Sequence, residues 1–486
     1  MMQRMAFIKN GLILCAALIL LPLAGWADEM FPHPETYVPS SQGKQAKEMF
    51  DDPSDLFVTH PFKDVLPPEV YDSIIFDQEK MKKEWAELVG FTSPELVGKI
   101  APEIKPGKYT YADLEKYPGL KELIPQEFQR FIKPGGPPFV GNIPEFEIIP
   151  TRQFYCNLPA AEATKRNLGK TKLDKKGYIV QGSWKGGVPF PRPSGEFKAQ
   201  QVFYNFFMRS NAFNMCWYVP STSMGYSRNL KQDTYFKVDV AKISWKGRTL
   251  FPPYGWFDKR AERNNEWCSY GYIMHEPRAQ RGTILLRMLY DNPEKQDPSM
   301  VYVPSLRRIR KMTATDTQDP TGDMTYDDQN MLLQKISPKK YAYKYEIIAE
   351  REYLLPYGYS SIPAWIDSKN NYAIRGLTLM RRPTYVLQMT QTDPYYVYSR
   401  RIYYIDKELF DTGLNDNYDQ KGLLYRTQCY LPFVFLPEGG WLINYGGFTV
   451  QRDYIDLHST LGMSNTHPAP WPRSRFSMYG LLKKAK

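Results

Sequence analysis

The chain has 486 residues, a formal charge of +11 and an aromatic content of 15%. This length leaves room for one large β domain with additions, or for two ordinary domains. A helical membrane protein is excluded, because no segment beyond the first 27 residues is apolar over the roughly 20 residues that a membrane span needs.

The amino-terminal 27 residues have the three parts of an export signal. Arg4 and Lys9 give a positive start, an apolar run follows, and Gly25 and Ala27 place small residues near the cleavage position. The apolar run is shorter than a membrane-spanning helix, so we expect cleavage rather than retention. The sequence therefore predicts a periplasmic protein, either free or associated with the outer membrane.

Export decides how the positive charge is interpreted. Outside the cytoplasm, nucleic acid is not an expected partner, and acidic lipid headgroups or glycans are the anions available. The alternative is that the charge only keeps the protein soluble.

Residues 28–138 form a proline-rich region with short helical patterns. Residues 77–90 have a helical period that ends at a glycine, and the apolar face comprises Met81, Trp85, Leu88 and Val89. Thr110 and Asp113 have the spacing of a capping box, and Pro118 and Pro125 divide the following helix. Residues 133–142 have the composition of a linker.

Residues 139–455 are rich in tyrosine, phenylalanine and β-branched residues, in short runs separated by turn signals. Runs such as "PTYVLQMTQ" and "GLLYRTQCYLPFVFL" are typical of strands. Asp419–Gly422 suits a type I turn with Gly422 in the left-handed position, which closes an antiparallel hairpin. The pattern predicts a mainly β fold with a large antiparallel sheet, as a sandwich, a barrel or an open half-barrel.

The remaining residues, 456–486, have little periodicity and predict a tail that lies on the surface or stays mobile. Four cysteines follow the signal segment, an even number compatible with three disulfide connectivities or with buried thiols. They are Cys156, Cys216, Cys268 and Cys429.

The motifs of common enzymes and cofactor sites are missing from the sequence, so we expect neither catalysis nor a metal or other cofactor. Two clusters of polar residues have side chains that could bind a cation. They are Asp323, Asp327 and Asp328 in one, and Asn415, Asn417 and Asp419 in the other. In both, side chains that bond their own backbone in turns are the favoured interpretation.

The segment "MVYVPSLRRIRKM" (Met300–Met312) concentrates positive charge behind a strand-like run. Val301 and Val303 share one strand face, and Pro304 interrupts the strand, as at a sheet edge or a bulge. The arginines that follow would straddle both faces of an extended strand. Leu306, Ile309 and Met312 recur every third residue, which favours a turning segment.

This segment, followed by "TGDMTYDD", resembles a paired signature in the superfamily of LolA/LolB-type lipoprotein-sorting proteins, and within it domain-of-unknown-function family 1329. Four further stretches agree in order. They are "IKPGKYTYADLEKY", "GGVPFPRPSGEFKAQQVFYNFFMRS" with the family's strand after Pro-Phe-Pro, "YEIIAEREYLLPY" and "RRIYYIDKELFDTGLNDNYDQKGLLYR".

The resemblance implies a large curved antiparallel sheet, an open half-barrel whose concave apolar side is covered by helices or loops. LolA-like and LolB-like members hold acyl chains there, and other relatives are thought to act beside outer-membrane β-barrel proteins and inner-membrane exporters. We expect the ligand site at the rim or in the lining of this concavity, with Tyr302, Leu306, Arg307, Arg308, Ile309, Arg310 and Tyr326.

The arginines would contact acidic headgroups, or else pair internally with the nearby aspartates. Three functions remain. The first is a periplasmic carrier of lipid, lipoprotein acyl chains or another hydrophobic molecule, accessory to envelope transport and in peripheral contact with a membrane. The second is a non-transporting assembly or interaction factor that partners an outer-membrane β-barrel protein. The third is a secreted enzyme that acts through scattered carboxylates.

Overall fold

The computed structural model describes residues 68, 72–136, 141–208, 216–227, 229, 231–250, 252–291, 295, 297–312, 320–321, 324–325, 343–358, 365–435, 439, 441–451, 454–460 and 473–484. None of the helices in these ranges has the length and apolar character of a membrane span. The expected signal segment, the residues around the predicted linker turn (137–140) and Tyr326 lie outside them.

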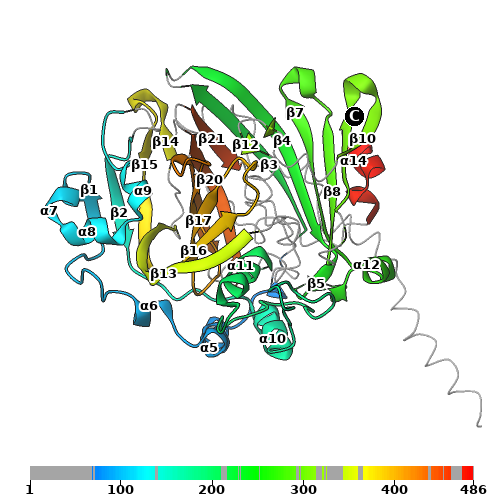
Figure 1. The fold of residues 1–486 in the computed structure, drawn as a ribbon, viewed down its shortest axis with the longest axis horizontal. Coiled ribbons are helices and arrows are strands. Elements are labelled where there is room, and N and C mark those ends of the chain that lie inside the picture. Colours follow the sequence, from blue (N-terminus) through cyan, green and yellow to red (C-terminus); the bar gives the residue numbers. More distant parts are fainter. Residues whose placement is uncertain are drawn as a thin grey trace, which may run out of the picture.

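One strongly curved sheet of 15 strands dominates the fold (Figure 1). Its order is β1 (Gly107–Thr110), β2 (Glu145–Ile149), β16 (Thr378–Gln391), β17 (Arg400–Asp406), β18 (Leu414–Tyr418), β19 (Leu424–Phe435), β20 (Trp441–Gln451), β21 (Tyr454–Thr460), β3 (Cys216–Ser227), β4 (Gln232–Ser244), β7 (Glu266–Glu276), β8 (Ile284–Tyr290), β9 (Ser299–Val303) and β10 (Arg308–Met312), with β13 (Tyr343–Pro356) paired to β16. All neighbours are antiparallel except β2 and β16. The predicted mainly β class and the open, curved sheet are confirmed, with this one parallel pair added.

Shorter elements surround the sheet. Three two-stranded ribbons are formed by β5 (Lys246–Arg248) with β6 (Gly255–Trp256), β11 (Pro320–Thr321) with β12 (Met324–Thr325), and β14 (Trp365–Asp367) with β15 (Ala373–Arg375). The helices are α5 (Gln78–Val89), α6 (Ser93–Leu96), α7 (Asp113–Lys116), α8 (Pro118–Leu123), α9 (Gln126–Gln129), α10 (Leu158–Asn167), α11 (Lys198–Met208), α12 (Lys259–Asn264) and α14 (Met478–Lys484). Single 3-10 turns are η4 (Arg278–Gln280), η5 (Pro304–Leu306), η7 (Ser368–Asn370) and η8 (Arg473–Phe476).

The sheet bends so that β13, β16 and β17 lie on one side of the molecule and β7–β10 on the other (Figure 1). We call β13, β16 and β17 the first arm and β7–β10 the second arm. The concave side between the arms is the inner face, and the convex side is the outer face. Successive residues of a strand point to opposite faces, so alternate side chains of each strand lie on the inner and the outer face.

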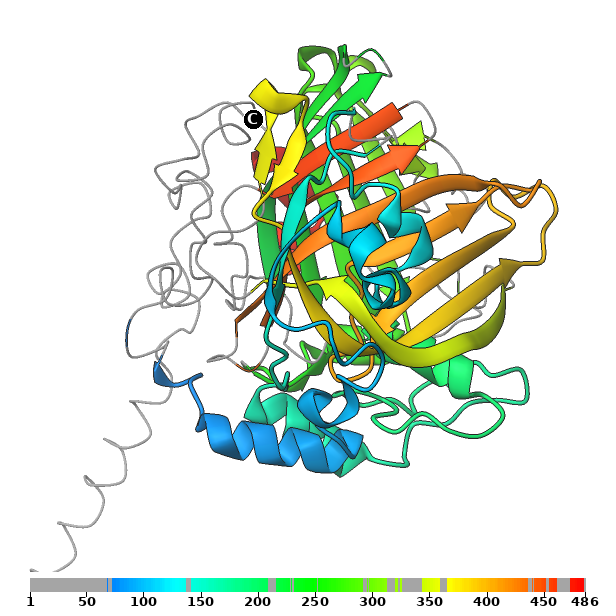
Figure 2. The ribbon, with the colours of Figure 1, turned by 90° about the vertical axis from the view of Figure 1, so that its left-hand side faces the viewer.

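Helices α7–α9 cover the outer face beside the first arm, as Figure 2 shows from that side. Their side chains Leu120, Leu123 and Phe128 share a hydrophobic core with Val386 and Tyr404 of the sheet. Helices separated by Pro118 and Pro125 are as predicted. The proline-rich region is therefore part of the main core, and it also contributes β1 to the sheet.

Helix α5 confirms the helical period read from the sequence. Its buried residues are Met81, Trp85, Leu88 and Val89. Gly90 ends the helix with a φ of 91° and donates its N–H to the Ala86 carbonyl. A left-handed residue at this position is the usual end of a helix, and glycine adopts it without a steric penalty.

The segment that carries α5 and α6 is fastened to the first arm by buried charges. Arg382 of β16 donates to Asp406 Oδ2 (2.5 Å) and to Glu408 Oε2 (2.8 Å), and its guanidinium stacks on Phe154 at 3.7 Å. Glu408 also accepts hydrogen bonds from the Ser93 hydroxyl (2.6 Å) and backbone N–H (3.1 Å). A buried ion pair is tolerated when its remaining donors and acceptors are satisfied in this way.

Helix α14, near the end of the chain, lies on the outer face of the second arm. Met478 and Leu481 of α14 pack with Ile273, Ile284 and Leu286 of β7 and β8. Residues 473–484 thus lie on the surface of the sheet, one of the two arrangements predicted for the tail, but they include a short helix that the sequence analysis did not predict.

Of the two alternatives that the sequence left open for the cysteines, buried thiols apply to three of the four. Cys156, Cys268 and Cys429 are buried thiols, the first two in one hydrophobic core and the third in another. The side chain of Cys216 lies outside the described part of the chain.

Candidate functional site

The structure places six of the seven predicted site residues, all except Tyr326, on one hairpin at the end of the second arm. Strands β9 and β10 are antiparallel, with Tyr302 opposite Ile309 and Val301 opposite Arg310. Leu306 ends the turn η5, and Arg307 follows with a left-handed φ of 47°. Pro304 interrupts the strand as the sequence predicted, but the prediction of a turning segment through Ile309 and Met312 is wrong, because Arg308–Met312 is an extended strand. Arg308 and Arg310 therefore share a strand face.

The two faces of this hairpin have different surroundings. Tyr302 packs beside α14 on the outer face. Val301 lies on the opposite face, in a cluster with Tyr270 and Leu285. Cys268, which has the same strand parity as Tyr270, packs in the core that contains α11. Arg308 and Arg310 therefore lie on the inner side of the sheet edge, and Ile309 lies on the outer side.

The aspartates expected as internal partners of the arginines fall in a part of the chain that the structure does not describe. Asp323, Asp327 and Asp328 lie outside the described residues, as does Tyr326. Within the described residues, no carboxylate forms an ion pair with Arg307, Arg308 or Arg310, and all three side chains are exposed. The hairpin is a basic, solvent-exposed surface of the described molecule.

Helix α11 is the main covering element of the inner face, and the sequence did not predict it. The stretch after Pro-Phe-Pro was expected to form a strand, as the family resemblance implied, but Lys198–Met208 is helical. Its apolar residues recur at helical spacing, at Ala199, Val202, Phe203, Phe206 and Phe207, and all are buried. This spacing in the sequence is itself sufficient to predict the helix.

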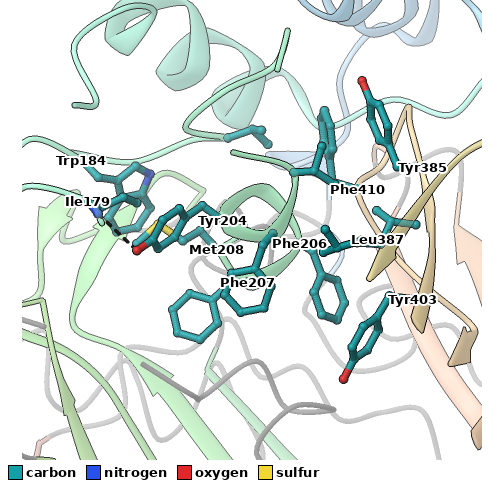
Figure 3. Packing of buried hydrophobic residues seen from close by; sticks show 14 of the residues in the cluster. Ile179, Trp184, Tyr204, Phe206, Phe207, Met208, Tyr385, Leu387, Tyr403 and Phe410 are labelled. Atoms are coloured by element: carbon teal, nitrogen blue, oxygen red, sulfur yellow. Dashed lines mark hydrogen bonds between the residues drawn. The ribbon is translucent and has the colours of Figure 1, made fainter. Parts of the chain in front are cut away.

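Rings on α11 contact both arms of the sheet (Figure 3). The ring centroid of Phe206 lies 5.6 Å from that of Tyr403 on β17, and Phe203 lies 5.1 Å from Tyr345 on β13. Phe207 lies 4.7 Å from Trp267 on β7. Because aromatic pairs at these separations attract each other, α11 joins the two arms through one aromatic core.

Polar contacts fix the position of α11. Asn205 accepts a hydrogen bond from the Phe190 N–H (2.9 Å) and donates to the Phe190 carbonyl (2.6 Å). Tyr204 accepts a hydrogen bond from the Ile179 N–H at 3.2 Å (Figure 3). Burial raises the pKa of Tyr204, so this hydroxyl stays protonated at physiological pH. The Pro-Phe-Pro segment thus serves as the anchor of the helix.

A band of polar side chains crosses the inner face between the arms. Strands β17–β20 contribute two rows of residues that lie opposite one another, Tyr403, Asn415, Gln428 and Thr449 in the first and Arg401, Asn417, Arg426 and Gln451 in the second. All are buried except Gln451, which is partly exposed. Asn415 donates to Gln428 Oε1 at 2.9 Å, and Thr449 Oγ1 has no hydrogen-bond partner in the described chain.

The sequence predicts that Asn415 and Asn417 lie in a turn. This prediction is wrong, because both residues lie on β18 and their side chains face inward. Only Asp419 has the predicted role. Its Oδ1 accepts the backbone N–H groups of Lys421 (2.9 Å) and Leu423 (3.0 Å). Its carbonyl accepts the Gly422 N–H at 2.9 Å, and Gly422 has a left-handed φ of 75°. The described residues contain no group of three potential metal ligands.

On the outer face of the same strands, one carboxyl group is unusually buried. Asp416 Oδ1 accepts the Thr427 hydroxyl at 2.7 Å, and Thr427 in turn lies 3.4 Å from the guanidinium of Arg130. Burial raises the pKa of Asp416 to about 7. This group lies under α9 and takes no part in the inner face.

Comparison with known proteins identifies the family. Residues 125–461, more than half of the chain, match the family DUF1329, a protein of unknown function. The chain belongs to this family, which confirms the resemblance drawn from its motifs. The comparison with curated proteins gave no match.

Three solved structures are similar to this chain. A Vibrio parahaemolyticus domain described as an outer membrane lipoprotein-sorting protein domain has 12% identity and a TM-score of 0.41, over 58% of this chain and 97% of its own. A DUF1329 family protein of Desulfovibrio piger has 13% identity and a TM-score of 0.40, over 58% and 98%. A LolA superfamily protein of Nitrosomonas europaea has 12% identity and a TM-score of 0.34, over 57% and 97%.

Proposed function

We propose that this protein is a periplasmic carrier that binds a lipid, a lipoprotein acyl chain or another hydrophobic molecule between the arms of its sheet, as an accessory to envelope transport. One observation carries the proposal. The inner face presents aromatic and aliphatic side chains from both arms, and α11 packs on them in a core that α5 and α10 also join. The export signal read from the first 27 residues supports the periplasmic location.

Binding of this kind requires apolar surface rather than catalytic groups. Each methylene removed from water contributes about 0.8 kcal/mol, so a ligand with a long alkyl chain can gain enough to replace ring contacts of α11. Helix α11 contacts the sheet through aromatic rings that a ligand can replace, while the hydrogen bonds of Asn205 to Phe190 keep the helix attached to the Pro-Phe-Pro segment. The ligand takes the place of the helix against the inner face.

The polar groups of the inner face favour an amphipathic ligand over a pure hydrocarbon. The hydroxyl of Tyr345 is buried and has no hydrogen-bond partner in the described chain, and the same holds for Thr449. A buried hydroxyl without a partner is unfavourable by about 1–3 kcal/mol, which a polar group on the ligand would recover. The ligand would place its chain on the aromatic core and its polar end toward the band on β17–β20.

Native mass spectrometry of protein purified from its own envelope tests the proposal. We expect a bound lipid or similar molecule, released when the protein is unfolded. A fluorescent alkyl probe should bind the purified protein, and Phe203→Ala should change its affinity. Tyr395→Ala, which alters a side chain that is 90% exposed, is the control.

Two results would contradict the carrier. A stoichiometric protein partner with no bound small molecule would favour the assembly factor that acts with an outer-membrane β-barrel protein. A probe affinity that is equal in the parent protein, Phe203→Ala and Tyr395→Ala would show that the aromatic core takes no part in binding.

A further inference from the structure

We infer that the protein docks on a negatively charged lipid membrane through the turns at the end of its second arm. This surface, the basic rim, comprises residues 275–283 between β7 and β8 and residues 304–311 between β9 and β10. The inference extends the proposed carrier role, because a carrier must meet the membrane that supplies or receives its ligand. It is tested separately from ligand binding.

The two turns of the basic rim lie side by side. A Cβ atom on Gly282 would lie 3.3 Å from Cγ of Pro304, so the β7–β8 turn touches the β9–β10 turn. Figure 1 shows both hairpins projecting at one end of the sheet, away from α10 and α11. They therefore form one continuous surface.

The basic rim has a strong excess of positive charge. It contains Arg278, Arg281, Arg307, Arg308, Arg310 and Lys311 against one carboxylate, Glu276. Glu276 is paired with Arg281 at 2.8 Å. The other five cations have exposed side chains and no ion pair within the described residues. A cluster of this size attracts anionic surfaces strongly at physiological ionic strength.

Exposed apolar side chains lie among these cations. Leu306 at the turn is 46% exposed and Ile309 on β10 is 51% exposed. On the outer face beside them, α14 adds Tyr479, which is 78% exposed, and the exposed Lys483. Apolar and aromatic side chains that project from a basic surface can enter the headgroup region while the cations contact phosphates.

This combination favours a lipid surface over an acidic protein or a sugar polymer. Cations alone would suit any anion, but solvated leucine and isoleucine gain only from an apolar environment. The rim is also adjacent to the inner side of the sheet edge, where Arg308 and Arg310 lie. A membrane bound at this rim would face the concavity between the arms.

Vesicle co-sedimentation of the full mature chain tests the inference. The probes are vesicles of phosphatidylethanolamine with phosphatidylglycerol, and neutral vesicles of phosphatidylcholine. We expect binding to the anionic vesicles that weakens with salt, and little binding to the neutral ones. Arg308→Gln with Arg310→Gln should weaken anionic binding about thirty-fold, and Leu306→Ser about five-fold.

A matched control removes the same charge elsewhere. Lys175→Gln with Lys176→Gln changes two exposed lysines in the segment between α10 and α11, and its vesicle binding should equal that of the parent. Circular dichroism melting should be the same for all variants, since every changed side chain is exposed. Equal binding by the rim variant and the lysine control overturns the inference, as does binding that ignores lipid charge.

The failure of docking and the failure of ligand transport are distinguishable. If the rim variant loses vesicle binding but retains the alkyl probe, the membrane surface is established independently of the ligand site. If the parent binds the probe but no vesicle, the carrier role stands and the docking inference fails. Recovery of an acidic protein in place of lipid, with no vesicle binding, also overturns it.

Discussion

The ring of Phe207 on α11 lies 4.7 Å from the indole ring of Trp267 on β7. Phe206, one residue earlier, contacts β17 on the opposite arm, so adjacent residues of one helix hold together strands that are far apart in the sheet order. The contact between the two arms across the inner face therefore depends on the side chains of α11.

We expect Phe207→Ala to lower the free energy of unfolding by about 3–5 kcal/mol, because a buried ring is lost from an aromatic core that joins both arms. Urea denaturation followed by tryptophan fluorescence measures the change. Tyr395→Ala removes a ring that is 90% exposed and should change stability by less than about 0.5 kcal/mol. Equal effects in the two variants would show that the α11 contact with β7 is unimportant.

We expect the loss of the Asn205 hydrogen bonds to destabilise α11 and the segment that it contacts. Asn205→Leu keeps a similar volume but removes both bonds to the Phe190 backbone. We expect a loss of about 2–3 kcal/mol, since a buried N–H and a carbonyl lose their partners. Hydrogen exchange should quicken in residues 198–208 and 186–192 while β18 keeps its protection. Uniformly faster exchange would mean that Asn205 supports the whole fold rather than the helix position.

Local patterns were sufficient to predict some of these elements. The helical period of residues 77–90 and the turn at Gly422 are encoded within a few residues, so the sequence predicts them correctly. The helix at residues 198–208 has an equally clear period. The family resemblance nevertheless implies a strand at this position, and the local spacing contradicts it.

Contacts between distant residues were not predictable from one sequence. Asn415 meets Gln428 only because β18 pairs with β19 in one register, and Phe207 meets Trp267 only because the sheet curves. The sequence predicts a basic segment because its positive charge is concentrated in five residues. The exposure of this hairpin depends on its place at the sheet edge, which the sequence does not show. Local sequence patterns therefore predict the strands and the basic hairpin, whereas the residues that line the inner face are determined by tertiary packing.

The ion pair between Arg382 and Glu408 is expected to stabilise the attachment of α5 and α6 to the sheet. Arg382→Met leaves the carboxylates of Asp406 and Glu408 buried without their cation, which should reduce stability by about 3–5 kcal/mol. Thermal unfolding and limited proteolysis of residues 72–96 report the effect, because Ser93 bonds to Glu408. Arg263→Met, at an exposed position of α12, is the control and should be neutral. A neutral Arg382→Met would exclude this network as the attachment of α5 and α6.

Asp416 predicts a pH dependence of stability. Its pKa in the folded state is about 7 against an ordinary value of 3.8, because burial disfavours the charged carboxylate. The folded state therefore holds a proton that the unfolded state releases, and this group destabilises the protein progressively as pH rises from about 4 to about 7. Asp416→Asn removes the ionisation and keeps the acceptor for the Thr427 hydroxyl. We expect it to raise the free energy of unfolding by roughly 2–4 kcal/mol at pH 8.

The expected gain should shrink as the pH falls toward 4, where Asp416 is protonated in both states. Urea denaturation at pH 4, 6 and 8 measures it, with Glu103→Gln at an exposed position as the control. Other ionisable groups that influence Asp416 or lie beside it on the outer face are unchanged in the variant; they are Glu127, Arg130, Tyr404, Tyr418 and Cys429. A gain that is the same at pH 4 and pH 8 would mean that the asparagine stabilises by packing or hydrogen bonding. The carboxyl group of Asp416 would then not be the source of the pH dependence.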